Sequence, residues 1–98
     1  MITTNNDFEW DLEKELKNIL KHGIAFHEAK EIFSDPSVIH LEDDKHSESE
    51  RRFYAVGKTD QGAIITVRYT LRGKTIRIIG AANWRKWRKH YEQNTESE

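Results

Sequence analysis

The spacing of the apolar residues changes once along the chain, near residue 51, and this change limits the fold more than any other feature. Between residues 12 and 34, apolar positions recur three or four residues apart, as they do along one side of a helix. From residue 51 the pattern becomes that of strands, and between residues 65 and 71 apolar and polar residues alternate, as in a strand with one buried face. Helices and strands therefore occupy separate blocks, which predicts an α+β fold rather than a parallel α/β fold.

The first block predicts a short strand followed by two helices. Residues 7–10 alternate polar and apolar, and Asp11 is suited to cap the helix that follows. Gly23 is suited to end that helix in the left-handed conformation. The predicted apolar stripe of this helix consists of Leu12, Leu16, Ile19 and Leu20. A second helix is predicted over residues 26–34, and Pro36 ends it.

The second block predicts an antiparallel meander of about four strands and a last helix. The strands are expected over residues 38–41, 53–58, 63–71 and 75–80. In the third of them Ile65, Val67, Tyr69 and Leu71 share one face, while Thr66, Arg68 and Thr70 share the other. The sheet should therefore have a packed face and a partly wet, positively charged one. A helix is expected from about Asn83, as its N-cap, to Asn94.

Length and composition favour one small domain in the cytoplasm. A chain of 98 residues suffices for a single modest core, and its ten aromatic residues argue against disorder. It has no cysteine, which is typical of a reducing compartment, and we expect neither a signal peptide nor a membrane span. The ordered core is expected over about residues 7–93, with a solvated loop over 42–50 and a polar tail over 94–98.

The near-neutral net charge hides a strong asymmetry. Residues 1–50 hold thirteen acids and five bases, a net charge of −8, whereas residues 51–98 hold four acids and eleven bases, a net charge of +7. This asymmetry favours a basic surface for an anionic ligand. The alternative is that both kinds of charge are mixed in space and simply solvated.

Arginines dominate the basic half. Five fall in the predicted meander and two in the last helix: Arg51, Arg52, Arg68, Arg72, Arg77, Arg85 and Arg88. The guanidinium group binds phosphate through a planar, permanently charged fork. We therefore interpret the set as a phosphate-binding surface, although antiparallel sheets also expose arginine for solubility.

The last helix interleaves aromatic and basic residues. Trp84, Trp87 and Tyr91 form one stripe, and this stripe either stacks on RNA bases or packs the helix onto the sheet, the reading that its spacing favours. The bases beside it are Arg85, Lys86, Arg88 and Lys89. The five histidines lack the spacing of zinc ligands, so no metal or other cofactor is expected, and His22 reads as a helix-end residue.

Several segments together resemble the BrnT family of ribonuclease toxins of bacterial type II toxin–antitoxin systems. The matching stretches are residues 8–11, 21–29, 32–36, 50–53 with Gly57, 67–72, 77–81 and 91–92. The resemblance implies a RelE-like fold and RNA cleavage without a metal. It also implies inhibition by a ribbon-helix-helix, BrnA-like antitoxin in a hetero-oligomer, which would bind operator DNA only through the antitoxin.

Carried onto this chain, the resemblance implies Arg52, Arg72 and Arg77 as catalytic residues. The expected chemistry is attack by the ribose 2′-hydroxyl on its own phosphodiester, with arginines stabilising the charge on the phosphate oxygens. Because arginine stays protonated, proton transfer falls to Tyr69 or His22. RNA contacts are expected from Arg68 and from the four bases of the last helix.

One departure from the family pattern concerns the end of the last strand. Where the family often reads Arg-Ile-Ile-Ser-Ala-Arg, this chain has Gly80 and Ala82, so the terminal arginine is absent. Arg85, one helical turn later, either replaces that charge or the activity is reduced. The alternative function is therefore a catalytically weak or inactive scaffold that binds RNA or acts as a co-repressor.

Overall fold

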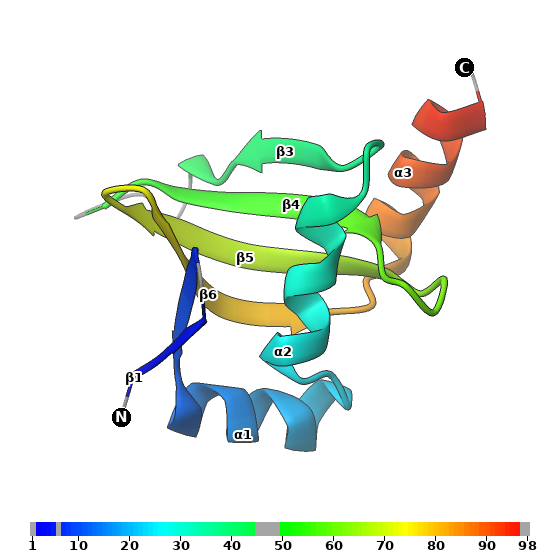
Figure 1. Ribbon diagram of the computed structural model, residues 1–98. Coiled ribbons are helices and arrows are strands. Elements are labelled where there is room, and N and C mark those ends of the chain that lie inside the picture. The colour runs from blue at the N-terminus through cyan, green and yellow to red at the C-terminus, as the bar shows by residue number, and fades with distance from the viewer. Residues whose placement is uncertain (1, 6, 45–49, 97–98) are drawn as a thin grey trace.

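The computed structural model describes residues 2–5, 7–44 and 50–96 and shows an α+β domain, as the sequence predicts (Figure 1). The order of elements is β1 (Ile2–Asn5), β2 (Phe8–Asp11), α1 (Leu12–His22), α2 (Phe26–Ala29), the 3₁₀ helix η1 (Lys30–Ser34), β3 (Ile39–Glu42), β4 (Arg52–Lys58), β5 (Ile64–Arg72), β6 (Thr75–Ala82) and α3 (Arg85–Glu96). No helix in the described part of the chain is both long and apolar enough to cross a membrane.

The strands form one six-stranded sheet in the order β1-β2-β6-β5-β4-β3. Strands β3 to β6 are the antiparallel meander that the sequence predicts. The N-terminal strand β2 joins it in parallel beside β6, and β1, which the sequence analysis did not predict, pairs with β2. The last helix begins at Arg85 rather than Asn83 and continues two residues past its predicted end. Most of the predicted loop, residues 45–49, lies outside the described residues.

Helix α1 has the predicted ends, but its apolar stripe is exposed. The side chain of Asp11 accepts a hydrogen bond from the amide of Glu13 at 2.8 Å, and Gly23 adopts φ 70° at the other end. The apolar stripe, however, faces solvent: none of the eleven residues of α1 is buried. Leu12 is 36% exposed, Leu16 61%, Ile19 39% and Leu20 88%. Such a stripe ordinarily packs on the core of its own domain, and this one does not.

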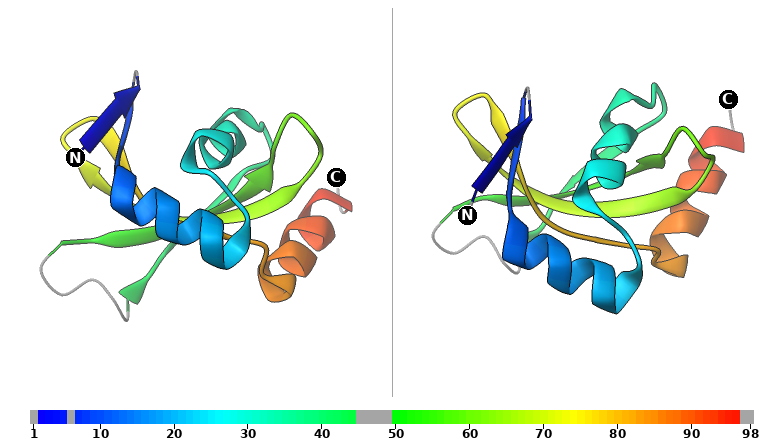
Figure 2. Two further views of the ribbon diagram at one scale, coloured as in Figure 1. Left: turned by 90° about the horizontal axis from the view of Figure 1, so that it is seen from below. Right: turned by 60° about the horizontal axis from the view of Figure 1, so that its bottom comes forward.

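Polar side chains attach α1 to the rest of the domain instead. Glu15 Oε1 accepts a hydrogen bond from Trp10 Nε1 at 3.1 Å. Asn18 donates to the carbonyl of Ile24 at 2.9 Å and accepts from the amide of Ala81 in β6 at 3.1 Å. Hydrogen bonds thus attach the inner face of this helix, and α1 lies along the β2–β6 side of the sheet (Figure 2).

Helices α2 and η1 cover the packed face of the sheet. They divide the predicted helix 26–34 into one α-helical turn and one 3₁₀ segment, and both keep its apolar side inward. Phe26, Ala29 and Ile32 are completely buried. At Gly57 of β4 a Cβ atom would lie only 2.9 Å from the Cβ of Ile32, so glycine permits this close approach of η1 to the sheet.

Helix α3 packs on the opposite face through its aromatic stripe, the reading that its spacing favoured. The rings of Trp84 and Trp87 lie 6.0 and 5.8 Å from that of Tyr54 in β4. Tyr91 is 3% exposed, and its hydroxyl donates to Asp35 Oδ2 at 2.5 Å. The contact with Asp35 ties the C-terminal helix to the turn that follows η1.

Replacing Asp35 with asparagine is expected to destabilise the domain at pH 7 and to matter progressively less below about pH 4. Burial raises the pKa of Asp35, but hydrogen bonds from Tyr91 and from the amides of Ser37 and Lys58 outweigh it and lower that pKa overall. A lowered pKa in the folded state stabilises the protein above the pKa of the unfolded chain, and this stability is lost as the pH falls through the folded pKa. Urea unfolding of both proteins at pH 7 and pH 3 measures the difference, and an equal difference at both pH values would contradict this account.

Candidate functional site

Three arginines lie on the same face of the sheet as α3. The strand register pairs Arg52 with Thr70 and Thr70 with Arg77, so these side chains share one face of β4, β5 and β6. Arg68 lies on the same face, opposite Tyr54. The sequence predicted a basic face of the central strand, and the pairing extends it across three strands.

A shallow groove of about 250 Å³ separates this basic face from α1. Its lining is Lys14, Lys17, Asn18, Lys21, His22, Arg68, Ile79 and Gly80. A smaller hollow of about 40 Å³ adjoins it, shares Asn18, His22, Arg68 and Gly80, and extends to Ala82 and Trp84. The described lining of the groove thus contains four cationic side chains and a histidine, and no carboxylate, which suits an anionic ligand.

Local backbone features set the floor of this groove. Arg68 pairs with Gly80, whereas the next residue, Tyr69, pairs with Ile78, so Ile79 is an extra residue in β6. Such a bulge bends a strand and redirects its side chains. Gly80 has no side chain of its own, and a Cβ atom there would meet only the Asn18 side chain, at 3.8 Å. The floor opposite Arg68 is therefore open.

Arg77 and Arg72 lie outside the described lining of the groove. Arg77 Nη1 contacts Glu9 Oε2 at 2.6 Å, with only 16% and 20% of the two side chains exposed. Removing one member of such a shielded pair leaves the other charge without its partner, which is costly. Arg72 is at the end of β5, half-exposed, with Nη2 3.5 Å from Glu50. Arg77 is thus paired within the fold and Arg72 lies at the end of its strand, so neither completes the groove.

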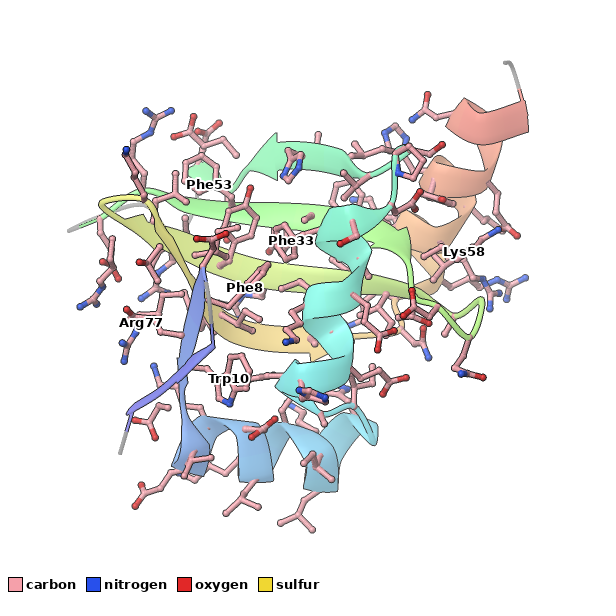
Figure 3. The ribbon with its side chains drawn as sticks, in the orientation of Figure 1. Phe8, Trp10, Phe33, Phe53, Lys58 and Arg77 are labelled. Atoms are coloured by element: carbon pink, nitrogen blue, oxygen red, sulfur yellow. The ribbon has the colours of Figure 1, made fainter. Side chains whose placement is uncertain are left out.

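Tyr69 lies on the other face of the sheet. It is 6% exposed, and its hydroxyl lies 2.8 Å from His40 Nδ1. Its ring contacts those of Phe33 and Phe53, with centroids 5.3 and 5.4 Å away, and burial raises its pKa. Since consecutive strand residues point to opposite faces, the structure does not bring Tyr69 together with Arg68. The labelled phenylalanines lie on this packed face in Figure 3.

The basic residues of α3 form a separate exposed row. Its members are Arg85, Lys86, Arg88 and Lys89. Lys86 Nζ lies 5.1 Å from the centre of the Trp87 ring. The row reaches the smaller hollow at Trp84, which lines that hollow and is 38% exposed. Ala82 is buried in the lining of the same hollow.

Sequence reasoning missed the contribution of α1 to this site. Lys14, Lys17 and Lys21 belong to the acidic half of the chain and were not singled out. Their spacing of three and four residues places them on one side of a helix. That spacing predicts a basic side of the helix. It does not predict that the basic side faces β5 and β6, because this placement depends on contacts between residues distant in sequence.

Comparison with known proteins agrees with the fold and covers most of the chain. The family model described as the ribonuclease toxin BrnT of a type II toxin–antitoxin system matches residues 10–90. The structure is similar to the 1.1 Å crystal structure of the Brucella abortus ribonuclease toxin BrnT, with a TM-score of 0.59 and 24% identity over 76% of this chain and 91% of that one. None of the curated proteins with which the chain was compared matches it. The chain therefore belongs to the BrnT family of ribonuclease toxins of type II toxin–antitoxin systems.

Proposed function

We propose that this chain is an endoribonuclease that needs no metal and that binds its RNA in the groove between α1 and the basic face of the sheet. The observation that carries the proposal is the described lining of that groove, where Arg68 and His22 lie among three lysines without a carboxylate. Phosphate groups gain most from such a surface, because the cations of the described lining have no carboxylate beside them in that lining and can pair with the ligand. The class of reaction, RNA cleavage, is proposed from the family, and its location is proposed from the lining of the groove.

The lysines of α1 would hold the backbone of the RNA. Lys14, Lys17 and Lys21 line one wall of the groove over the length of the helix, so they can contact successive phosphates. On the other side, the exposed part of Trp84 offers an aromatic surface for a base, and the basic row of α3 continues beyond it. Arg77 is paired with Glu9 and Arg72 lies near Glu50, so this proposal gives neither of them a phosphate contact.

The chemical step would be attack by a ribose 2′-hydroxyl on the adjacent phosphorus. The bond from phosphorus to the 5′-oxygen of the next nucleotide breaks, which leaves a 2′,3′-cyclic phosphate and a free 5′-hydroxyl. Arg68 would stabilise the charge that develops on the non-bridging oxygens. His22 would accept the proton of the 2′-hydroxyl or return one to the leaving oxygen, a role that arginine cannot perform. Tyr69 takes no part in this proposal, because it lies on the other face.

The absence of arginine at position 82 leaves a second candidate function. Ala82 lines the smaller hollow where the family often has a charge, so a chain that binds RNA without cutting it would also fit the lining. In either case we propose that the protein works in the cytoplasm as a hetero-oligomer with a ribbon-helix-helix antitoxin, and reaches operator DNA only through that antitoxin.

Expression of the chain without an antitoxin separates the two candidates. We expect growth to stop and total RNA to break down, because the groove is free for RNA when no partner occupies it. Arg68→Ala, produced at the same soluble level, is the control and should permit growth. Normal growth with intact RNA despite soluble wild-type protein would favour the scaffold and contradict the enzyme.

A further inference from the structure

Helix α1 is inverted relative to an ordinary surface helix. Its inner face is polar, since Glu15 and Asn18 attach it to its neighbours by hydrogen bonds. Its outer face carries the apolar stripe, Leu12, Leu16, Ile19 and Leu20, between 36% and 88% exposed. A globular domain normally turns such a stripe towards its own core. A contiguous apolar patch of this kind marks a surface that a partner covers.

The residues beside the stripe indicate the charge of that partner. Lys17 and Lys21 lie on the same helix, between the stripe and the groove that their side chains line. Of the acids of α1, Glu15 is engaged by Trp10 and the Phe26 amide, whereas Glu13 is exposed near the N-terminal end of the stripe. On the side that leads to the groove, an occupant of the stripe therefore meets aliphatic side chains bordered by positive charge. An amphipathic segment with carboxylates beside its apolar residues complements that side.

A second copy of the chain fits this surface less well. Two copies joined through their stripes would bring the lysines of both helices close together, and like charges oppose association. A stable interface takes about 20–30 residues from each partner, far more than the outer face of an eleven-residue helix provides. The occupant must therefore also contact a surface beyond α1. The adjoining surface is the groove, whose described lining contains four cationic side chains and no carboxylate.

We propose that the apolar face of α1 is where the antitoxin docks. An amphipathic antitoxin segment covers Leu16 and Leu20, and its acidic residues reach over Lys17 and Lys21 into the groove. The bound segment then holds the cations that would otherwise hold RNA phosphates, so docking and inhibition are one event. The inhibitory part rests on the proposed function, whereas the docking part does not.

The test uses the full chain and the purified small protein encoded beside its gene. Leu16→Glu/Leu20→Glu changes only exposed positions, so the fold should be unaffected, as circular dichroism and urea unfolding can verify. We expect this double variant to bind the small protein roughly 100-fold more weakly or worse, because two buried anchors of an interface are replaced by charges. Cells that express both proteins should then fail to be protected from the variant toxin.

Leu71→Glu is the matched control, because this leucine is 51% exposed on β5 and lies outside both α1 and the described lining of the groove. It should bind the small protein as the wild type does. Equal binding of the double variant and the wild type, or no binding of the wild type, overturns the proposal. A wild-type chain that is dimeric by itself and becomes monomeric in the double variant also overturns it, in favour of a second copy. Binding is measured without RNA, so a chain that proved unable to cut RNA would still give a result.

Discussion

Replacing Arg68 with alanine is expected to slow RNA cleavage by about 10²–10³-fold, the usual cost of removing one donor that stabilises transition-state charge. The arginine is in the middle of β5 and lines both the groove and the smaller hollow. Its effect should fall mainly on kcat, since the lysines of α1 still bind the RNA backbone. The measurement is single-turnover cleavage of a labelled RNA in the presence of EDTA.

Two variants control for the loss of charge and of fold. Arg51→Ala removes an arginine whose guanidinium is held by Glu42 through bonds of 2.8 and 2.9 Å, outside the described lining of the groove. It should cut RNA at nearly the wild-type rate. Arg68→Lys keeps the charge but loses the planar fork, so its rate should fall between those of wild type and Arg68→Ala. Equal losses in Arg51→Ala and Arg68→Ala would show that total charge, and not this position, governs cleavage.

Replacing Phe26 with alanine is expected to cost about 3–5 kcal/mol of the free energy of unfolding, because it empties a large space in a small core. Phe26 is completely buried, its ring meets that of Trp10 edge-on with centroids 6.4 Å apart, and its amide donates to Glu15. Domains of this size are stable by only about 5–15 kcal/mol, so the variant should be largely or partly unfolded at 37 °C. Urea unfolding followed by tryptophan fluorescence provides the value.

The matched control for this loss is Leu20→Ala. Leu20 is 88% exposed, so its truncation in the free chain should change stability by less than about 0.5 kcal/mol. Alanine is also the better helix former, which offsets part of any loss. Comparable losses at Phe26 and Leu20 would mean that α1 packs its stripe internally after all.

The sequence predicted best what local interactions decide. The Asp11 cap and the Gly23 terminus depend on residues a few positions apart, and the structure confirms both. The two faces of β5 are confirmed as well, with Arg68 and Tyr69 on opposite sides, but not all of the predicted burial. Thr66 and Thr70 of the face predicted to be partly wet are buried, because further elements cover that face, and Leu71 of the packed face is 51% exposed. The sequence could not predict the parallel pairing of β2 with β6, which joins residues nearly seventy positions apart. It could not predict that the stripe of α1 is exposed either, because periodicity shows that a face is apolar, but not whether the same chain covers it.

In the candidate site, too, local features could be predicted from the sequence and contacts distant in sequence could not. The alternation of β5 already placed Arg68 and Tyr69 on opposite faces, and this information was available without the structure. The groove was not, because it forms only where the hydrogen bonds of Asn18 bring α1 beside β6. Lys14, Lys17 and Lys21 line the groove only because that contact places α1 beside β6.

The most direct measurement is an analysis of the products of RNA cut by the purified chain in EDTA. The proposed step predicts fragments that end in a 2′,3′-cyclic phosphate, no cleavage where a single 2′-deoxynucleotide replaces the attacking ribose, and near-complete loss of these products in a His22→Ala/Arg68→Ala double variant. Products with a 3′-hydroxyl, cleavage that EDTA abolishes, or a double variant that cuts at the wild-type rate would contradict a metal-independent reaction in this groove.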